Sequence, residues 1–201
     1  MELKLKTLTE ACEPVLLKER KSKFYGYAFP IQNEEDAKHL VAQLRKEHPL
    51  ANHVCHAWKI GLTQPMYRAS DDGEPNNSAG KPIYGQIQAF EVTNVLVAVV
   101  RIFGGVKLGV GGLIQAYKAA AQMALASCEL VIVDPSYRFR LKFTYVFMDR
   151  IMRVIKQQNL EIQEQDLALD CTLIVGCPQS KIERVEEAFA QIRELEWLRL
   201  E

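Results

Sequence analysis

Residues Asn94 to Gly112 read NVLVAVVRIFGGVKLGVGG, and this stretch organises the rest of the chain. The run from Val95 to Val100 is apolar and rich in β-branched residues, which predicts a strand buried on both faces. Five glycines follow within nine positions, namely Gly104, Gly105, Gly109, Gly111 and Gly112. Residues 113–129 are rich in alanine and lack proline and glycine, so they predict a helix. The order is therefore strand, glycine loop, helix.

This layout is typical of an anion-binding loop, because the first turn of a helix presents unpaired N–H groups. The known phosphate motifs are nevertheless absent. Lys107 is followed by Leu108, which excludes a P-loop, and Ile114 stands where a dinucleotide motif needs glycine. Two interpretations stay open: the loop approaches a ligand, or it is a tight turn that packs a helix closely on a sheet.

The composition sets broad limits. A chain of 201 residues can form one large domain or two small ones. The 25 basic and 25 acidic side chains balance, which argues against non-specific nucleic-acid binding through bulk charge. No apolar run approaches a membrane span and the N-terminus has no apolar signal core, so we expect a soluble, cytoplasmic protein. Five cysteines without a Cys-x-x-Cys motif predict buried free thiols rather than disulfides.

The first part of the chain predicts two strands within residues 1–32, a helix from Asn33 that ends before Pro49, and a strand that begins near His53. A basic cluster lies between the first strands and is either a solvated turn or an anion contact; it comprises Lys18, Arg20, Lys21 and Lys23. On a strand, His53 and Cys55 point away from His56, so one metal ion would need a bent strand. We therefore expect no metal at these histidines.

Residues 61–81 predict a long polar loop, which is usually functional or disordered in a compact domain. It contains Arg68 and three carboxylates within four residues, those of Asp71, Asp72 and Glu74. The carboxylates could hold a divalent cation, or they could bond local N–H groups in a turn shaped by Gly73. A short helix is expected from Pro82 to Phe90.

A break at Asp134-Pro135 predicts two domains, residues 1–134 and 135–201. The second has the order β-α-β-β-α-β, in which helices at 148–158 and 178–194 alternate with strands at 137–145, 160–165, 169–175 and 197–200. The alternation from Tyr137 to Tyr145 predicts a half-buried strand with a basic outer face.

Several motifs together resemble the IMPACT family, and in particular its bacterial, YigZ-like branch. They are Lys21-Ser22-Lys23-Phe24, Ala51 to Trp58, Asp71-Asp72-Gly73-Glu74-Pro75 with Ala79-Gly80-Lys81-Pro82, and Asn94 to Leu113 with Ala116-Tyr117. The match covers roughly residues 15 to 125. The resemblance implies an α+β fold with two domains: the first like ribosomal protein S5 domain 2 and domain IV of elongation factor G, and the second ferredoxin-like.

The resemblance also implies a link to translation. Eukaryotic relatives regulate translation initiation through an additional N-terminal domain, which the pattern found here does not include, so that pathway is not carried over. A translation-linked or RNA-linked role remains as the expectation. Because it rests on analogy of fold, it needs support from the site itself.

The favoured hypothesis is a non-enzymatic, translation-associated regulator that binds the ribosome, structured RNA or a protein, without cofactor, metal or membrane. The binding residues would come from the acidic and glycine-rich loops: His53, Arg68, Asp71, Asp72, Glu74, Arg101, Gly104, Gly105, Lys107, Gly109, Gly111 and Gly112. The alternative is a metal-dependent hydrolase that uses Asp71, Asp72 and Glu74. A third interpretation is structural, with the same carboxylates bracing the glycine loop through its N–H groups.

Overall fold

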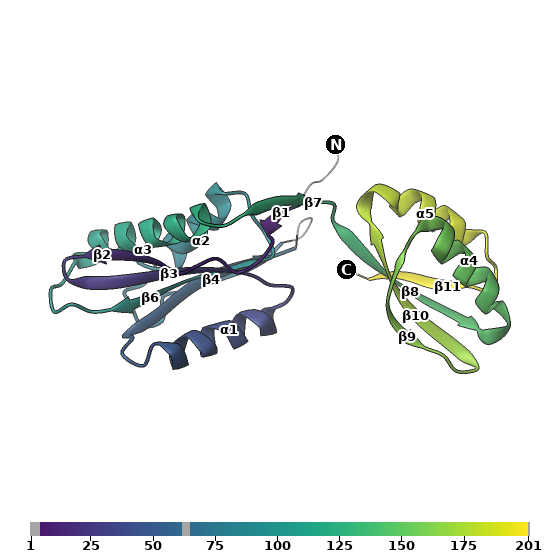
Figure 1. The fold of residues 1–201 in the computed structure, drawn as a ribbon, viewed down its shortest axis with the longest axis horizontal. Helices are drawn as coiled ribbons and strands as arrows, with labels where there is room; N and C mark the ends of the chain where they lie inside the picture. Colours follow the sequence, from purple (N-terminus) through teal and green to yellow (C-terminus); the bar gives the residue numbers. More distant parts are fainter. Residues whose placement is uncertain (1–4, 62–64, 201) are drawn as a thin grey trace. The chain divides into compact units, whose positions relative to one another are not determined.

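The computed structural model describes residues 5–61 and 65–200. These residues form two compact units, one from Leu5 to Val133 and the other from Asp134 onward. Both units are mixed α/β structures (Figure 1). No helix in the part of the chain that the structure describes is long and apolar enough to cross a membrane.

The first unit is built on a five-stranded antiparallel sheet in the order β2-β3-β6-β4-β5. Helices α2 and α3 cover one face of this sheet and α1 covers the other (Figure 1). A separate two-stranded sheet pairs β1 with β7. The bounds are β1 Leu5–Leu8, β2 Val15–Glu19, β3 Ser22–Pro30, α1 Glu34–Glu47, β4 His53–Ile60, β5 Met66–Ser70, α2 Gly80–Ala89, β6 Val95–Ile102, α3 Gly109–Ala126 and β7 Leu130–Val133.

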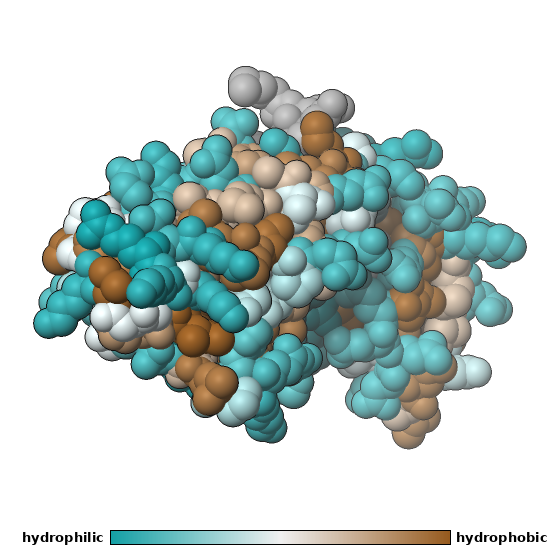
Figure 2. Space-filling model, turned by 60° about the vertical axis from the view of Figure 1, so that its left-hand side comes forward, coloured by the Kyte–Doolittle hydropathy of each residue, from teal (hydrophilic) through white to brown (hydrophobic). Residues whose placement is uncertain are grey.

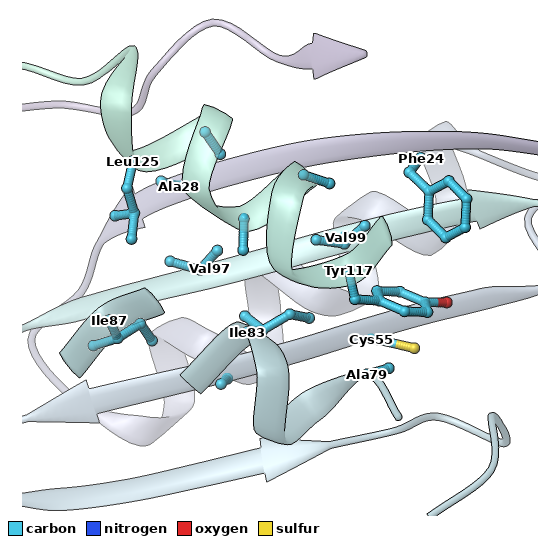
Figure 3. Close-up of a cluster of buried hydrophobic side chains, with 14 of the residues drawn as sticks. Phe24, Ala28, Cys55, Ala79, Ile83, Ile87, Val97, Val99, Tyr117 and Leu125 are labelled. Carbon is cyan, nitrogen blue, oxygen red and sulfur yellow. The ribbon is translucent and has the colours of Figure 1, made fainter. Parts of the chain in front are cut away.

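Strand β6 is the centre of the sheet, and its residues Val95 to Val100 are fully buried, as their apolar sequence predicts. Val97 and Val99 point toward α2 and α3, where they pack with residues such as Ile83 and Tyr117 (Figure 3). The intervening Ala98 and Val100 point toward α1. Burial on two faces explains why the strand carries no alternation of polar and apolar residues.

Helix α1 begins where its cap signals predict. The side chain of Asn33 accepts a hydrogen bond from the N–H of Asp36, and Asp36 accepts one in return from the N–H of Asn33. This reciprocal cap satisfies two of the donors that a helix start leaves unpaired.

Three strands lie where the sequence predicted none, namely β1, β5 and β7. Strand β5 falls inside the expected polar loop, because it is an edge strand with four of its five residues exposed and so lacks a buried face. Strand β1 is short and pairs only with the distant β7. Two helices also begin early: α2 starts at Gly80, and α3 starts at Gly109 inside the glycine run. Packing of α3 on the sheet outweighs the low helix propensity of glycine.

The prediction that all five cysteines are free thiols is wrong for one pair. Cys12 and Cys128 form a disulfide, with Cα atoms 5.3 Å apart and a sequence separation of 116. Cys12 follows β1 and Cys128 precedes β7, so the unforeseen pairing of Leu8 with Leu130 brings the two cysteines together. The remaining thiols are free and buried, as expected; they belong to Cys55, Cys171 and Cys177.

The second unit has the element order β-α-β-β-α-β that the sequence predicts. Its bounds are β8 Ser136–Thr144, η1 Tyr145–Phe147, α4 Met148–Gln158, β9 Glu161–Asp166, β10 Asp170–Pro178, η2 Gln179–Lys181, α5 Ile182–Ala190 and β11 Glu196–Leu200. The strands form an antiparallel sheet in the order β11-β8-β10-β9. On β8, Phe139 and Leu141 are buried while Arg138 and Arg140 are exposed, as its alternation indicates. Helix α5 is shorter than the predicted 178–194.

The segment between β6 and α3, residues 103–108, contains Gly104 and Gly105, and we call it the glycine bend. It offers a test of the fold. A side chain at Gly104 would overlap the carbonyl group of Lys21, whereas nothing lies near the corresponding position at Gly111. We therefore expect Gly104→Ala to lower the free energy of unfolding by about 3 kcal/mol, since backbone cannot yield as a side chain can. Gly111→Ala, the matched control in the first turn of α3, should change it by less than about 1 kcal/mol. Urea denaturation of both variants measures this; equal effects would contradict the close approach.

Candidate functional site

A cavity of about 420 Å³ opens where three segments meet: the end of β6, the start of α3 and the turn at residues 71–75, which we call the acidic turn. Its lining residues are Asn52, His53, Glu74, Pro75, Arg101, Phe103, Lys107, Leu108, Gly109, Val110 and Leu113. The acidic turn and the glycine bend, which are separated by some thirty residues of sequence, therefore face one concave surface.

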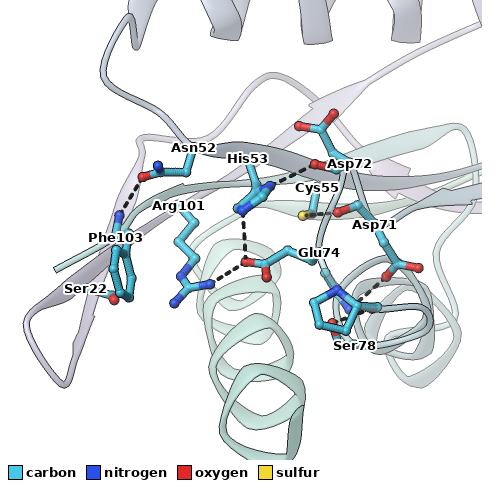
Figure 4. Close-up of polar contacts among 12 residues, drawn as sticks. Ser22, Asn52, His53, Cys55, Asp71, Asp72, Glu74, Ser78, Arg101 and Phe103 are labelled. Atoms are coloured by element: carbon cyan, nitrogen blue, oxygen red, sulfur yellow. Dashed lines mark hydrogen bonds and ion pairs between the residues drawn. The ribbon is translucent and has the colours of Figure 1, made fainter. Parts of the chain in front are cut away.

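Glu74 is the central polar group of the cavity and is buried. Its Oε1 accepts a hydrogen bond from Arg101 Nη1 at 2.6 Å (Figure 4). The same oxygen accepts one from the Tyr117 hydroxyl at 2.8 Å. His53 Nε2 lies 3.8 Å from the same oxygen. The sheet register places His53 of β4 directly opposite Arg101 of β6, which explains why both reach Glu74. One carboxylate thus joins β4, β6 and α3.

Arg101 is only 6% exposed although it lines the cavity. Its guanidinium carbon lies 5.4 Å from the ring centroids of both Phe24 and Phe103, so two aromatic rings flank the cation. Within the described part of the chain, its Nε has no hydrogen-bond partner. Arg101 is therefore held in place by Glu74 and the two rings, while part of its donor capacity is unused.

Asp71 is directed away from the cavity, toward the start of α2. Its carboxylate accepts hydrogen bonds from the N–H groups of Asn77, Ala79 and Gly80, at 2.8 to 2.9 Å. Its backbone carbonyl accepts one from the Cys55 thiol. Asp71 therefore caps α2 and shapes the turn, which is the local role that the sequence left open for these acids.

Asp72 faces the opposite side of the sheet. Its carboxylate accepts a hydrogen bond from the N–H of Val54 and forms an ion pair with Arg45 of α1. Its backbone carbonyl accepts a hydrogen bond of 2.8 Å from His53 Nδ1, which fixes the orientation of that imidazole. Asp72 thus ties the acidic turn to β4 and α1.

The predicted binding residues are therefore only partly assembled. His53, Glu74, Arg101, Lys107 and Gly109 line the cavity, whereas Asp71, Asp72, Gly104, Gly105, Gly111 and Gly112 lie outside its lining. Arg68 is on the edge strand β5, where it pairs with Glu34 of α1 at 3.1 Å. Gly104 instead packs on the β2–β3 turn and donates its N–H to the hydroxyl of Ser22.

Sequence reasoning missed six lining residues: Asn52, Pro75, Phe103, Leu108, Val110 and Leu113. Asn52 was recoverable, since a polar residue just before a buried strand suggests a role; its Oδ1 accepts a hydrogen bond from the N–H of Phe103 at 2.8 Å. Phe103 itself is 42% exposed. An exposed aromatic residue beside paired glycines is the one available signal for it.

The two alternative interpretations of the acids find little support in this geometry. Each carboxylate proposed for the hydrolase already has other partners, and no group of three or more metal-binding side chains occurs within the described ranges. The structural interpretation, in which these carboxylates accept hydrogen bonds from the N–H groups of the glycine loop, is wrong. The acids accept hydrogen bonds from their own turn, from β4, from Arg101 and from Tyr117, and the glycine bend is held by Ser22 and Asn52 instead.

Burial raises the pKa of two further buried side chains, those of Cys55 and Tyr117. It raises the pKa of the Cys55 thiol to about 12, so this thiol is neutral at physiological pH and acts as a donor rather than a nucleophile. Burial also raises the pKa of Tyr117, which keeps its hydroxyl available to donate to Glu74.

Comparisons with known proteins agree on one family. Residues 20–125 match the family model of the Impact N-terminal domain. An "IMPACT family member" of Haemophilus influenzae is 33% identical over 82% of this chain and 81% of its own length. "IMPACT family member YigZ" of Escherichia coli is 33% identical over 81% of both chains. A relative in Thermus thermophilus reaches 40% identity over 72% of this chain and 78% of its own.

Solved structures extend the comparison to the whole chain. One described as "Crystal structure of an hypothetical protein" superposes with a TM-score of 0.77 and 29% identity, covering 100% of this chain and 98% of the other. The structure of "two-domain translational regulator Yih1" is 27% identical but covers 64% of this chain and 48% of its own, with a TM-score of 0.40, which is too low to argue from.

Removing the central carboxylate should destabilise the first unit strongly. Glu74→Ala leaves Arg101 buried without its counter-charge, which we expect to lower the free energy of unfolding by about 3–5 kcal/mol. The matched control is Glu34→Ala, which breaks the exposed pair with Arg68 and should cost less than about 1 kcal/mol. Chemical denaturation gives both values; a Glu74 variant as stable as the control would contradict a central role for this pair.

Proposed function

The chain belongs to the IMPACT family as a YigZ-like member, and from that premise we propose that it is a regulator of translation. In this proposal it binds the ribosome or structured RNA through the cavity at the start of α3, which we call the α3 cavity. The observation that carries the proposal is the junction of the acidic turn with the glycine bend at one rigid concave surface.

The rim of the α3 cavity combines two kinds of group that suit RNA. Phe103, Val106 and Val110 are exposed apolar side chains, with exposed fractions of 42%, 40% and 53%. Lys107 lies among them and is also exposed. Aromatic rings stack on unpaired bases and lysines contact phosphates, so a ring and a cation side by side suit a looped or single-stranded RNA segment.

The β2–β3 turn extends this positive surface. Arg20 and Lys21 adopt left-handed backbone conformations, with φ of 44° and 68°, and form the tip of the hairpin. The backbone of Lys21 packs against Gly104, which places the basic tip beside the glycine bend. Lys18 of β2 and Lys23 of β3 lie opposite each other in the register of the two strands. The tip of the basic cluster that the sequence left ambiguous therefore lies beside the glycine bend, which supports an anionic partner in this proposal.

On the face drawn in Figure 2, brown apolar patches alternate with teal polar side chains. A surface of this kind suits a partner that is read through a few charged and stacking contacts better than one that needs a broad apolar interface. This favours RNA over a permanent protein partner.

The fold of each unit fits the same proposal by analogy. The first unit would correspond to domain IV of elongation factor G and the second to a ferredoxin-like domain of that factor. Both kinds of domain are known from ribosome-bound proteins, which is an argument from fold and supports the class of partner alone. The chemistry of the α3 cavity has to identify the contact.

The proposal predicts that Phe103 contributes to RNA binding. Phe103→Ala should weaken binding of the full chain to ribosomal particles or to ribosomal RNA by roughly 10-fold, the order expected for loss of one stacked base. The control is Met123→Ala, which removes a similarly exposed apolar side chain from the far end of α3 and should leave binding unchanged. Co-sedimentation with ribosomal subunits and filter binding to purified RNA, each at two salt concentrations, measure both.

Two results would refute the proposal. One is the absence of binding to ribosomal particles and RNA at low salt, where phosphate contacts are strongest. The other is equal loss of binding in the Phe103 and Met123 variants, which would place the contact elsewhere.

A further inference from the structure

Helices α2 and α3 cover the same face of the sheet, but their N-termini differ in whether a carboxylate accepts their unpaired N–H groups. The start of α2 is neutralised by Asp71, whose carboxylate accepts the N–H groups of Ala79 and Gly80. The start of α3 receives no side-chain cap, and its first turn contains no acidic residue. Helix α3 is 18 residues long, so its unpaired N–H groups carry the full partial positive charge of a helix end.

The uncapped turn opens into the α3 cavity. Gly109 and Val110 line this cavity, so the donors of the first turn border the same space as Lys107. Gly109 has a φ of 73°, a left-handed conformation that glycine adopts readily and that begins the helix immediately after the bend. Lys107 forms no ion pair among the residues that the structure describes.

Arg101 supplies a second, independent indication of a ligand. It is buried to more than nine-tenths and it lines the same cavity. Within the described ranges, the hydrogen bond found for its guanidinium runs from Nη1 to Glu74, which leaves the N–H groups of Nη2 without a partner. Its Nε is also unpaired, but that atom is enclosed by the protein and is not the donor that a ligand would reach. A buried guanidinium with unused donors is costly unless a further acceptor reaches it, and the open side of the α3 cavity is where one can enter.

The charges around this space leave a net positive surplus. Glu74 is the carboxylate that lines it, and Arg101 and Tyr117 already compensate that charge. Among the residues that the structure describes, Lys107 and the N-terminus of α3 then have no negative partner. A helix N-terminus next to a lysine and an arginine is the arrangement that binds oxyanions such as phosphate.

We propose that the first turn of α3, with Lys107 and Arg101, is a phosphate subsite that holds one backbone phosphate of the bound RNA. This inference rests on the proposed function and assigns its chemistry: phosphate on the α3 turn, with the neighbouring base against Phe103. The same subsite accepts free inorganic phosphate, and the experiment separates these two sources.

The test substitutes an exposed residue of the subsite. Val110→Asp places a carboxylate within the first turn of α3, where it satisfies the free N–H groups and occupies the position of the phosphate. Because an acid suits this end of a helix, the variant should remain folded, with an unchanged or higher melting temperature. Val110→Asn is nearly identical in shape but uncharged. Gln122→Glu adds the same charge to an exposed position far along the same helix.

Inorganic phosphate is the first probe, followed through the backbone amide resonances of Gly109, Val110 and Gly111. In the unaltered chain and in Gln122→Glu, we expect saturable shifts of these resonances, and Val110→Asn, which changes the same side chain without adding charge, should weaken them less than Val110→Asp. In Val110→Asp, the shifts should be lost. Binding of ribosomal RNA is the second probe: Val110→Asp should weaken it roughly 10-fold, and the slope of log K against log salt should fall by about 1.

The outcomes separate the subsite from the proposed function. Phosphate shifts that persist in Val110→Asp, or that are equally lost in Gln122→Glu, overturn the subsite. RNA binding that is weakened by Phe103→Ala but unchanged by Val110→Asp overturns the subsite and leaves the proposed function standing. Phosphate binding lost only in Val110→Asp, in a chain that binds neither RNA nor ribosomes, confirms the phosphate chemistry and refutes RNA as its source.

Discussion

The buried ion pair between Glu74 and Arg101 is the interaction on which the rest of the first unit depends. It joins the acidic turn to the last part of β6, and the Tyr117 hydroxyl adds α3 to the same carboxylate oxygen. Such a pair gains little net stability over an apolar one, because both charges lose their hydration. Its value lies in specificity, since loss of one partner leaves the other charge buried. The pair therefore fixes the position of three segments that share no local sequence signal.

That constraint decides what the surface can do. Because Asp71, Asp72 and Glu74 are each committed to donors of this chain, the acidic turn has no free carboxylate to offer a cation. The same commitment leaves the basic groups of the glycine bend without compensation. A loop that looks acidic in sequence thus helps to build a surface that is locally positive. The distinction arises because hydrogen bonding, rather than composition, sets which charges remain available.

The sequence predicted those parts of the structure that follow from local patterns. The buried strand β6, the capped start of α1 and the β-α-β-β-α-β order of the second unit are read directly from periodicity and cap residues. The Cys12–Cys128 disulfide joins residues separated by 116 positions, and strand β1 pairs with the equally distant β7; no local pattern records either contact. The prediction of the site residues was only partly right for a related reason. Asp72 and Gly73 have φ of 46° and 87°, and this sharp turn sends three neighbouring carboxylates in three directions. Spacing in sequence could not reveal which of them faces the cavity.

The net charge of zero remains compatible with an anionic partner once distances are considered. Charges in water interact over a Debye length of about 8 Å at physiological salt, so a ligand at the start of α3 responds to its immediate neighbours. Those neighbours are Lys107 and the N-terminus of α3, together with the ion pair in which Arg101 and Glu74 compensate each other. The balanced composition therefore excludes attraction of nucleic acid from a distance, and it leaves recognition at close range to a few fixed groups. A chain of this kind selects its partner by fit at one cavity rather than by bulk charge.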